Sequence, residues 1–308
     1  MKIITVTLNP AIDFHIRLNT LSLGKDNKAK VERRDNGGKG VNLSRALKAY
    51  GIDSICYTVL GEENGKGFID ELEALGIDHR YLSVKGAVRE NINIHSESED
   101  TVIATSGFSL DGEGLSRVEE ELLSLVEEND VLCFCGRIPE DADKNKIIDM
   151  LLSFKKKGAR LVLDSKSLNK NDLFILKPYL IKPNEEELFS LGEEYACECD
   201  WFDKTVNRLH KGGVENILVT LGDKGGILSQ GNSRYSAKVP SIKAISTVGA
   251  GDSTIAGYLA GVRLGLSVEE CFRLALSFGT AACLAEGSLP PDPCQIKTLL
   301  SRIEIDKK

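Results

Sequence analysis

Thr247-Val248-Gly249-Ala250-Gly251-Asp252-Ser253 joins a glycine-rich turn to an amphipathic helix, and the rest of the chain can be interpreted from this junction. Over residues 252–264 apolar side chains recur at spacings of three and four, which predicts one buried stripe along a helix. The stripe consists of Ile255, Tyr258, Leu259 and Val262. Free N–H groups and the positive end of a helix favour anions. We therefore predict an anion site formed by Gly249, Ala250 and Gly251.

The carboxylate of Asp252 lies in the same turn and suggests acid–base chemistry. A carboxylate held beside an anion site could take a proton from an attacking hydroxyl, while the backbone N–H groups stabilise a negative phosphoryl group. The alternative is an ordinary helix N-cap, a position in which Asp is common. The residues of this segment leave both interpretations open.

Two further glycine segments follow the same logic. In Asp35-Asn36-Gly37-Gly38-Lys39-Gly40-Val41-Asn42, glycines allow close approach of the backbone to a ligand, and Lys39 and Asn42 supply a cation and a neutral hydrogen-bonding group. Residues 219–227, with Thr220, Gly222 and Gly225, predict a strand, a glycine turn and a second strand. Taken alone, each of these segments is a weak signal.

Strands alternating with helices predict an α/β fold with a mostly parallel sheet covered on both faces. Strands are expected at 3–8, 55–60, 131–134, 161–163, 180–182 and 217–220, and helices at 40–50, 65–75, 114–128, 143–157, 184–191, 252–264 and 268–285. Residues 14–34 and 90–105 instead alternate apolar and polar side chains, which is typical of antiparallel strands with one wet face. We expect a single domain over 1–308, with lid strands from about 12–35 and 88–106 forming a small sheet over the main one.

Composition limits the function classes. The 308 residues are 42% hydrophobic and 28% charged, with a net charge of −7, which argues against disorder and against broad nucleic-acid or anionic-membrane binding. Residues 25–45 are locally positive, with seven basic against three acidic side chains. This local charge suits either a small anionic ligand or a solvated surface. Without a long apolar run or a signal peptide, we expect a cytoplasmic protein.

Several familiar chemistries lack their signatures. The sequence has no P-loop, dinucleotide-binding, serine-hydrolase or zinc-peptidase motif. Its eight cysteines are expected to be reduced. Cys133 and Cys135 fall on one face of a buried strand, and Cys197 and Cys199 lack the further ligands of a zinc site. We set cysteine–metal binding aside.

Together the segments resemble the ribokinase-like carbohydrate kinases of the PfkB family. Thr7-Leu8-Asn9-Pro10-Ala11-Ile12-Asp13 and residues 37–42 are similar to its sugar-binding segments, and residues 249–252 to its anion hole and catalytic base. Lys182-Pro183-Asn184-Glu185-Glu186-Glu187 is similar to its Asn-x-x-Glu motif, which acts through magnesium and phosphate. The resemblance implies a three-layer α/β/α sandwich with a mostly parallel sheet, a small discontinuous β-sheet lid, and ATP and Mg²⁺ as cofactors.

Within this family, residues 9–13 followed by Gly-Gly-Lys-Gly resemble the branch of 1-phosphofructokinases and tagatose-6-phosphate kinases. The resemblance implies phosphorylation of a ketohexose phosphate, first of all fructose 1-phosphate to fructose 1,6-bisphosphate. The alternatives are tagatose-6-phosphate kinase, another PfkB sugar kinase and, from a different class, a sensor that binds sugar phosphate and nucleotide without turnover. A nicotinamide oxidoreductase would need the missing glycine fingerprint.

The resemblance also implies roles for individual residues. Asp252 would be the base, and Gly249, Ala250 and Gly251 the anion hole. The sugar phosphate would contact Asp13, Gly37, Gly38, Lys39, Asn42, Arg89, Arg137 and Lys25. The nucleotide would lie along Lys182, Asn184, Thr220, Gly222, Gly225 and the region near Gly279, and Mg²⁺ would act through water near Glu187 and Asn184.

Two positions depart from the branch. Arg137, in Cys135-Gly136-Arg137-Ile138-Pro139, replaces a small hydroxyl residue, and it could strengthen phosphate binding or alter the sugar accepted. Lys166, in Asp164-Ser165-Lys166, replaces a small residue and could reach a phosphate or only solvent. The lid strands also leave unpaired edges, so a homodimer is a further hypothesis.

Overall fold

A computed structural model of the chain describes residues 1–97 and 99–307. Its largest element is a ten-stranded sheet in which the strands from β11 to β5 are parallel and the others antiparallel. The spatial order is β14 (Asp306–Lys307), β13 (Ser233–Ala237), β12 (Gly226–Gln230), β11 (Asn216–Thr220), β10 (Leu180–Ile181), β9 (Arg160–Asp164), β8 (Val131–Cys135), β1 (Ile3–Thr7), β4 (Ile55–Gly61) and β5 (Asp78–Val84).

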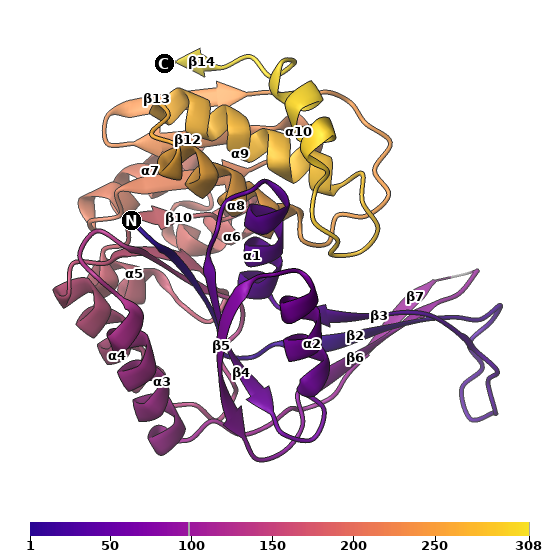
Figure 1. The fold of residues 1–308 in the computed structure, drawn as a ribbon. Coiled ribbons are helices and arrows are strands. Elements are labelled where there is room, and N and C mark those ends of the chain that lie inside the picture. The colour runs from indigo at the N-terminus through magenta and orange to yellow at the C-terminus, as the bar shows by residue number, and fades with distance from the viewer. Residues whose placement is uncertain (98, 308) are drawn as a thin grey trace.

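Helices cover both faces of this sheet, because successive side chains of a buried strand point to opposite faces and both sets are apolar (Figure 1). Ile3 joins the core beneath one helix layer, and its neighbour Ile4 joins the core beneath the other. The first layer holds α1 (Lys39–Ala49), α8 (Ala250–Arg263), α9 (Val268–Ala282) and α10 (Pro293–Leu300), with α2 (Lys66–Ala74) packed beside α1. The second holds α3 (Gly112–Leu125), α4 (Lys144–Lys156), α5 (Lys170–Leu176), α6 (Glu185–Leu191) and α7 (Trp201–Lys211). The predicted three-layer α/β/α architecture is confirmed.

A second sheet, here called the lid sheet, projects from the body as an arm (Figure 1). Its four strands lie in the order β3 (Lys30–Gly37), β2 (Ala11–Arg17), β6 (Arg89–His95) and β7 (Asp100–Ala104). Each hairpin is antiparallel as expected, but β2 and β6 pair in parallel. The expectation of purely antiparallel strands was wrong, because both strands leave the main body in the same direction.

The elements that the sequence analysis missed are short or polar. Helices α5 and α10 span seven and eight residues, too few to repeat an apolar stripe. Helix α7 was also missed, although buried Thr205, Val206 and Leu209 form its inner face. The edge strand β5 buries only one of its seven side chains, that of Leu82.

Helix α8 also differs from its predicted single stripe. It is buried along most of its length, from Asp252 to Gly261, because it lies between α1 and α9. Gly257 permits this packing, since a Cβ there would lie 2.7 Å from the backbone oxygen of Leu274. Asp252 is therefore enclosed, although Ala250 and Gly251 before it are partly exposed.

The cysteines of the two predicted pairs differ in burial. Cys133 and Cys135 of β8 are buried in the same core, as predicted, and Cys197 and Cys199 are exposed. Within residues 1–97 and 99–307, no cluster of three or more His, Cys, Asp or Glu side chains could hold a metal ion by itself. No helix in this part of the chain has the length and apolar character needed to cross a membrane.

Candidate active site

The carboxyl ends of the parallel strands meet at one edge of the main sheet, where α/β folds bind ligands. Helix α8 begins at this edge with Gly249 as its N-cap, at a φ of 74° that disfavours other residues. Asp252 is therefore the third residue of the helix and not its N-cap. Its carboxylate is 6% exposed and accepts a hydrogen bond from the side-chain amide of Asn42, with 2.9 Å between Nδ2 and Oδ2.

Burial sets the acidity of Asp252. Loss of hydration raises the pKa of its carboxyl group to about 6, and the nearby charge of Asp164 acts in the same direction. Lys39, the Asn42 amide and Lys182 oppose the rise by favouring the charged form. The group is thus mostly ionised at neutral pH yet remains a far better proton acceptor than a solvated carboxylate.

Two lysines converge on Asp164, the last residue of β9. Lys39 Nζ lies 3.0 Å from its Oδ2, and Lys182 Nζ lies 4.0 Å from its Oδ1. Asp164 and Asp252 together hold the pKa of Lys39 at about 12, against the opposing effect of burial. The Lys182 ammonium also faces α8, because a Cβ on Gly251 would lie 3.1 Å from it. Two fixed cations therefore flank the helix terminus, as the binding of phosphate groups requires.

A second group of charges lies at the base of the lid sheet. Asp13 accepts a hydrogen bond from Asn91 across the β2–β6 pair at 2.7 Å, and Arg89 donates to Asn91 at 3.2 Å. Gly37 leaves room for this carboxylate, because a Cβ there would lie 2.6 Å from Asp13 Oδ2. The site side of the lid sheet thus presents a carboxylate, an amide and a guanidinium.

Arg89 is a half-buried cation with an unused hydrogen-bond donor, as expected of a residue that binds an anion. Burial lowers its pKa, Asp13 raises it, and the neighbouring positive charge of Arg137 lowers it further. Its Nε is buried without a hydrogen-bond partner among the residues that the structure describes. Two guanidinium groups close enough to repel each other, one with an unused donor, fit a bound anion.

The nucleotide candidates gather on the other side of α8. Asn184 and Glu187 form a capping box at the start of α6, and Asn184 pairs with Thr220 in an isolated parallel bridge. A cavity of about 610 Å³ is lined by Asn184, Thr220 and Gly222, together with Phe189 and Trp201. These two aromatic residues were not singled out from the sequence, since their role depends on the packing of α6 against α7.

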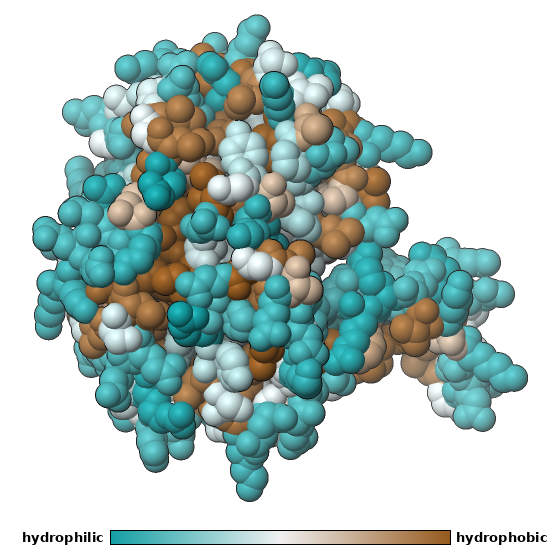
Figure 2. All heavy atoms as spheres, in the orientation of Figure 1, coloured by the Kyte–Doolittle hydropathy of each residue, from teal (hydrophilic) through white to brown (hydrophobic). Residues whose placement is uncertain are grey.

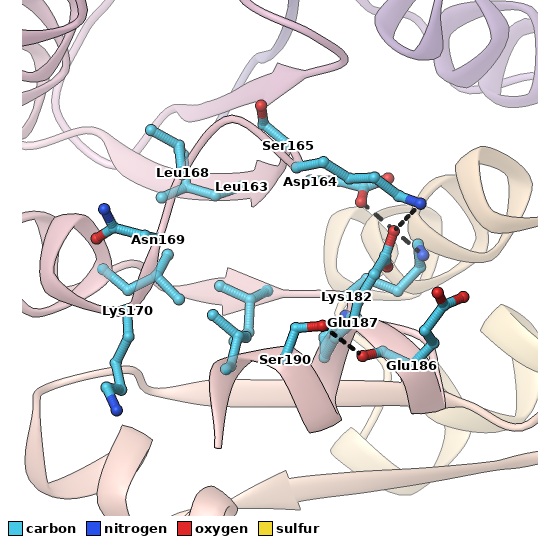
Figure 3. Close-up of a pocket in the computed structure, with 15 residues that line it drawn as sticks. Leu163, Asp164, Ser165, Leu168, Asn169, Lys170, Lys182, Glu186, Glu187 and Ser190 are labelled. Carbon is cyan, nitrogen blue, oxygen red and sulfur yellow. Dashed lines mark hydrogen bonds and ion pairs between the residues drawn. The ribbon is translucent and has the colours of Figure 1, made fainter. Parts of the chain in front are cut away.

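A second cavity, of about 430 Å³, opens beside Asp164 between β9, β10 and α6 (Figure 3). Its floor is apolar, with Leu163 and Leu168 among the side chains, and its rim carries lysines and carboxylates. Lys166, which also lines the cavity, pairs with Glu187, with 3.5 Å between Nζ and Oε1. In this structure Lys166 therefore reaches a carboxylate, which neither predicted alternative included.

Three predicted site residues stand apart from the charged groups described above. Lys25 is exposed in the loop joining β2 to β3, at the outer end of the arm and roughly 20 Å from its base at 3.3 Å per strand residue. Gly279 is buried in α9 against the start of α8, where a Cβ would lie 2.3 Å from Thr254 Oγ1 and 3.3 Å from Ala250 O, so its lack of a side chain serves helix packing beside the anion site. Gly225 likewise shapes the β11–β12 turn at a φ of 99°, with a Cβ only 2.0 Å from Ala237 O.

Two site residues were missed. Asp164 was quoted only as part of a departure from the family pattern, although it directly follows an expected strand, where ligand-binding residues are common. Arg45 is 5% exposed and donates to Asn42 Oδ1 at 3.3 Å and to Asn36 O at 2.6 Å. Its spacing of three from Asn42 along one helix was the available signal.

The donor set suits a magnesium ion bound mainly through substrate. Glu187 Oε1 points to the rim of the cavity, and Asp164 lies close by, so carboxylate oxygens are available beside the phosphate-binding cations. Mg²⁺ typically takes one or two protein carboxylates and completes its shell with water and phosphate oxygens. Asn184 Oδ1 already accepts from the Glu187 amide at 2.7 Å, which leaves it a contact through water.

Comparisons with known proteins found related carbohydrate kinases. Residues 6–294 match the model of the pfkB family of carbohydrate kinases. The chain is 31% identical over 287 residues to the 1-phosphofructokinase of Bacillus subtilis, covering 92% of this chain and 93% of that protein. It is 30% identical over 280 residues to a tagatose-6-phosphate kinase of Staphylococcus epidermidis, covering 90% of each. Phosphofructokinase-2 of Escherichia coli has the same fold, with a TM-score of 0.89 at 23% identity over 98% of both chains.

Proposed function

Since the chain belongs to the pfkB family of carbohydrate kinases, we propose that it transfers the γ-phosphoryl group of ATP to a ketohexose phosphate, and that fructose 1-phosphate is its best acceptor. The product would be fructose 1,6-bisphosphate. The observation that carries the proposal is the half-buried Arg89, which is linked to Asp13 through Asn91 and whose Nε has no hydrogen-bond partner among the described residues, because a sugar without a phosphate needs no guanidinium group there.

The charged residues at the base of the lid sheet and those beside α8 have different roles in this proposal. Arg89 and Arg137 hold the phosphate already on the sugar, while Asp13 and Asn42 orient its hydroxyl groups. Lys39 is engaged with Asp164 beside α8, so we assign it to the transferring phosphoryl group and no longer to the substrate phosphate. The reacting hydroxyl then lies between the lid sheet and Asp252.

Transfer starts when Asp252 accepts the proton of the acceptor hydroxyl. The oxygen attacks the γ-phosphorus and ADP leaves, while the N–H groups of residues 250–252, Lys39 and Lys182 stabilise the charge on the phosphoryl group. Glu187 and Asp164 would hold a Mg²⁺ ion, which when bound would neutralise charge on the ATP phosphates. Asn184, Thr220 and Gly222 position the nucleotide along the 610 Å³ cavity. The lid sheet excludes water, which otherwise competes as acceptor.

A coupled assay of ADP release tests the proposal with fructose 1-phosphate, fructose 6-phosphate, tagatose 6-phosphate and ribose. The highest kcat/KM is expected with fructose 1-phosphate. Preference for tagatose 6-phosphate would favour the second candidate, which the relative from Staphylococcus epidermidis supports. Preference for ribose would overturn the assignment to phosphosugars, and binding without any ADP release would identify a sensor.

We also propose that the chain forms a homodimer through the lid sheet. Alternation and register place Phe14, Ile92 and Ile103 on the face opposite Asp13, and apolar side chains gather on the arm in Figure 2. Ile103 is 51% exposed and Val31 63% exposed, so this apolar face is open to water. Sedimentation should show a dimer that Ile103→Glu dissociates, and a monomeric wild type would refute it. The cytoplasmic location stays a prediction.

A further inference from the structure

Lys166 follows β9 and lines the 430 Å³ cavity together with Glu187, its ion-pair partner. Figure 3 shows this cavity. Its side chain is 61% exposed, and its ammonium group lies 3.5 Å from Glu187 Oε1. Within residues 1–97 and 99–307, this ammonium group forms no other ion pair or hydrogen bond. The lysine is thus held by one carboxylate and is free to move away from it.

Glu187 can offer only one of its two oxygens to a ligand. Oε2 accepts from the backbone N–H of Asn184 at 3.0 Å as part of the α6 capping box, which fixes the direction of the carboxylate. Oε1 therefore faces the cavity rim, where Lys166 meets it. Because an ammonium group and a divalent cation cannot occupy the same position beside one oxygen, the two exclude each other there.

The other carboxylate at the rim, that of Asp164, is held by two ammonium groups. Asp164 is 5% exposed and faces two buried or half-buried ammonium groups, those of Lys39 at 3.0 Å and Lys182 at 4.0 Å. A cation approaching without phosphate groups would meet three positive charges around Asp164 and Glu187. The weakest of these contacts is that of Lys166, because exposed ion pairs contribute little.

We propose that Lys166 is a tethered competitor of the divalent cation at Glu187, an inference that rests on the metal site of the proposed function. With the site empty, its ammonium group satisfies Glu187. A metal ion arriving alone must displace it and gains no phosphate contacts, so it binds weakly. A metal ion arriving with a nucleotide brings phosphate oxygens, to which the displaced ammonium group can turn. The enzyme is thereby biased toward loading metal and nucleotide together.

The test measures Mn²⁺ binding to the full chain without nucleotide, from the electron paramagnetic resonance signal of free Mn²⁺. Lys166→Ser should lower the Kd for Mn²⁺ roughly three- to tenfold, the range expected when a partly screened charge is removed. Lys166→Arg keeps the charge and should stay within twofold of wild type. The gain of Lys166→Ser should disappear when Glu187→Gln is added, since the competition takes place at that carboxylate.

Lys170 provides a matched control. It lines the same cavity and pairs with Glu194, away from Glu187. Lys170→Ser removes the same charge from the lining of the same cavity, and it should leave the Kd for Mn²⁺ within twofold of wild type. An equal gain from Lys166→Ser and Lys170→Ser would mean a general effect of net charge and would overturn the proposal.

Two other results would also overturn it. One is a Kd for Mn²⁺ that does not change in Lys166→Ser, and the other is a gain that survives in the double variant with Glu187→Gln. ADP release with fructose 1-phosphate, measured on the same samples, reports separately on the proposed function. An active kinase with unchanged Mn²⁺ binding refutes the role of Lys166 alone, whereas an inactive wild type refutes the proposed function.

Discussion

Asn42 donates its side-chain amide to the carboxylate of Asp252 over 2.9 Å, although 210 residues separate the two in the chain. This hydrogen bond favours the charged carboxylate and keeps its pKa from rising further than about 6. Arg45 sets the direction of the amide, because its Nη1 donates to Asn42 Oδ1 and leaves Nδ2 to face Asp252. The contact joins the first glycine segment to the last and sets the strength of the proposed base.

Asp252→Asn should lower kcat by roughly 10²–10⁴, the usual contribution of a positioned general base, because it keeps the shape and removes the basic oxygen. ATP binding, measured by calorimetry, should change little. Asp149→Asn, on the exposed side of α4, is the control and should retain wild-type kcat. A kcat within about threefold of wild type in Asp252→Asn would show that the carboxylate is not the base.

The pH dependence of kcat/KM should report the same group in the free enzyme. Since the base must be ionised, log kcat/KM should fall with a slope of one as pH drops below about 6, the pKa to which burial raises Asp252. Asn42→Ala removes a hydrogen bond that lowers this pKa, so its profile should shift to higher pH. A profile that keeps its midpoint in Asn42→Ala would separate the titration from Asp252.

Stability should show the cost of burying this charge. Asp252 has a raised pKa in the folded state, so the native protein binds more protons than the unfolded chain between pH 4 and 6, and wild-type stability falls as pH rises through that window. Asp252→Asn avoids this loss and should be more stable above pH 6, on the order of 1–3 kcal/mol. Thermal unfolding at pH 8 and pH 4 tests this, and the gain should vanish at the lower pH.

Arg89→Ala should weaken binding of the substrate phosphate. A lost charge-assisted contact is worth roughly 1.5–3 kcal/mol, which corresponds to about a 10- to 150-fold higher KM for the sugar phosphate with little change in the KM for ATP. Arg117→Ala is the control, because that arginine is exposed on α3, away from the lid sheet. Equal KM values for wild type and Arg89→Ala would remove Arg89 from the phosphate site.

Arg137→Ser tests the departure from the family pattern, since it restores the usual small hydroxyl residue. If Arg137 shares the phosphate with Arg89, the KM for fructose 1-phosphate should rise as well. Lys39→Met should instead lower kcat, because Lys39 is engaged with Asp164 beside Asp252. An unchanged KM in Arg137→Ser would make this guanidinium a surface substitution.

Local patterns in the chain were enough to predict much of this protein. The 3.6-residue period located α1, α4 and α9, glycine turns marked the start of α8, and two-residue alternation predicted the lid strands. These features depend on neighbours within one or two turns of chain, which a sequence displays directly. The family resemblance added roles for individual residues. Of these, Lys25 lies at the outer end of the lid sheet, whereas Gly279 is buried against Ala250 and Thr254 of α8.

The charges of the site depend on contacts that no local pattern contains. Lys39 reaches Asp164 across 125 residues, and Asn42 reaches Asp252 across 210, because the strand order of the sheet brings their loops to one edge. Burial of Asp252 between α1 and α9 then raises its pKa. Because Lys39 pairs with Asp164, we assign it to the reaction centre and no longer to the sugar phosphate. The sequence specifies which charged and polar side chains are present. Their pairing and their hydration follow from packing between distant segments.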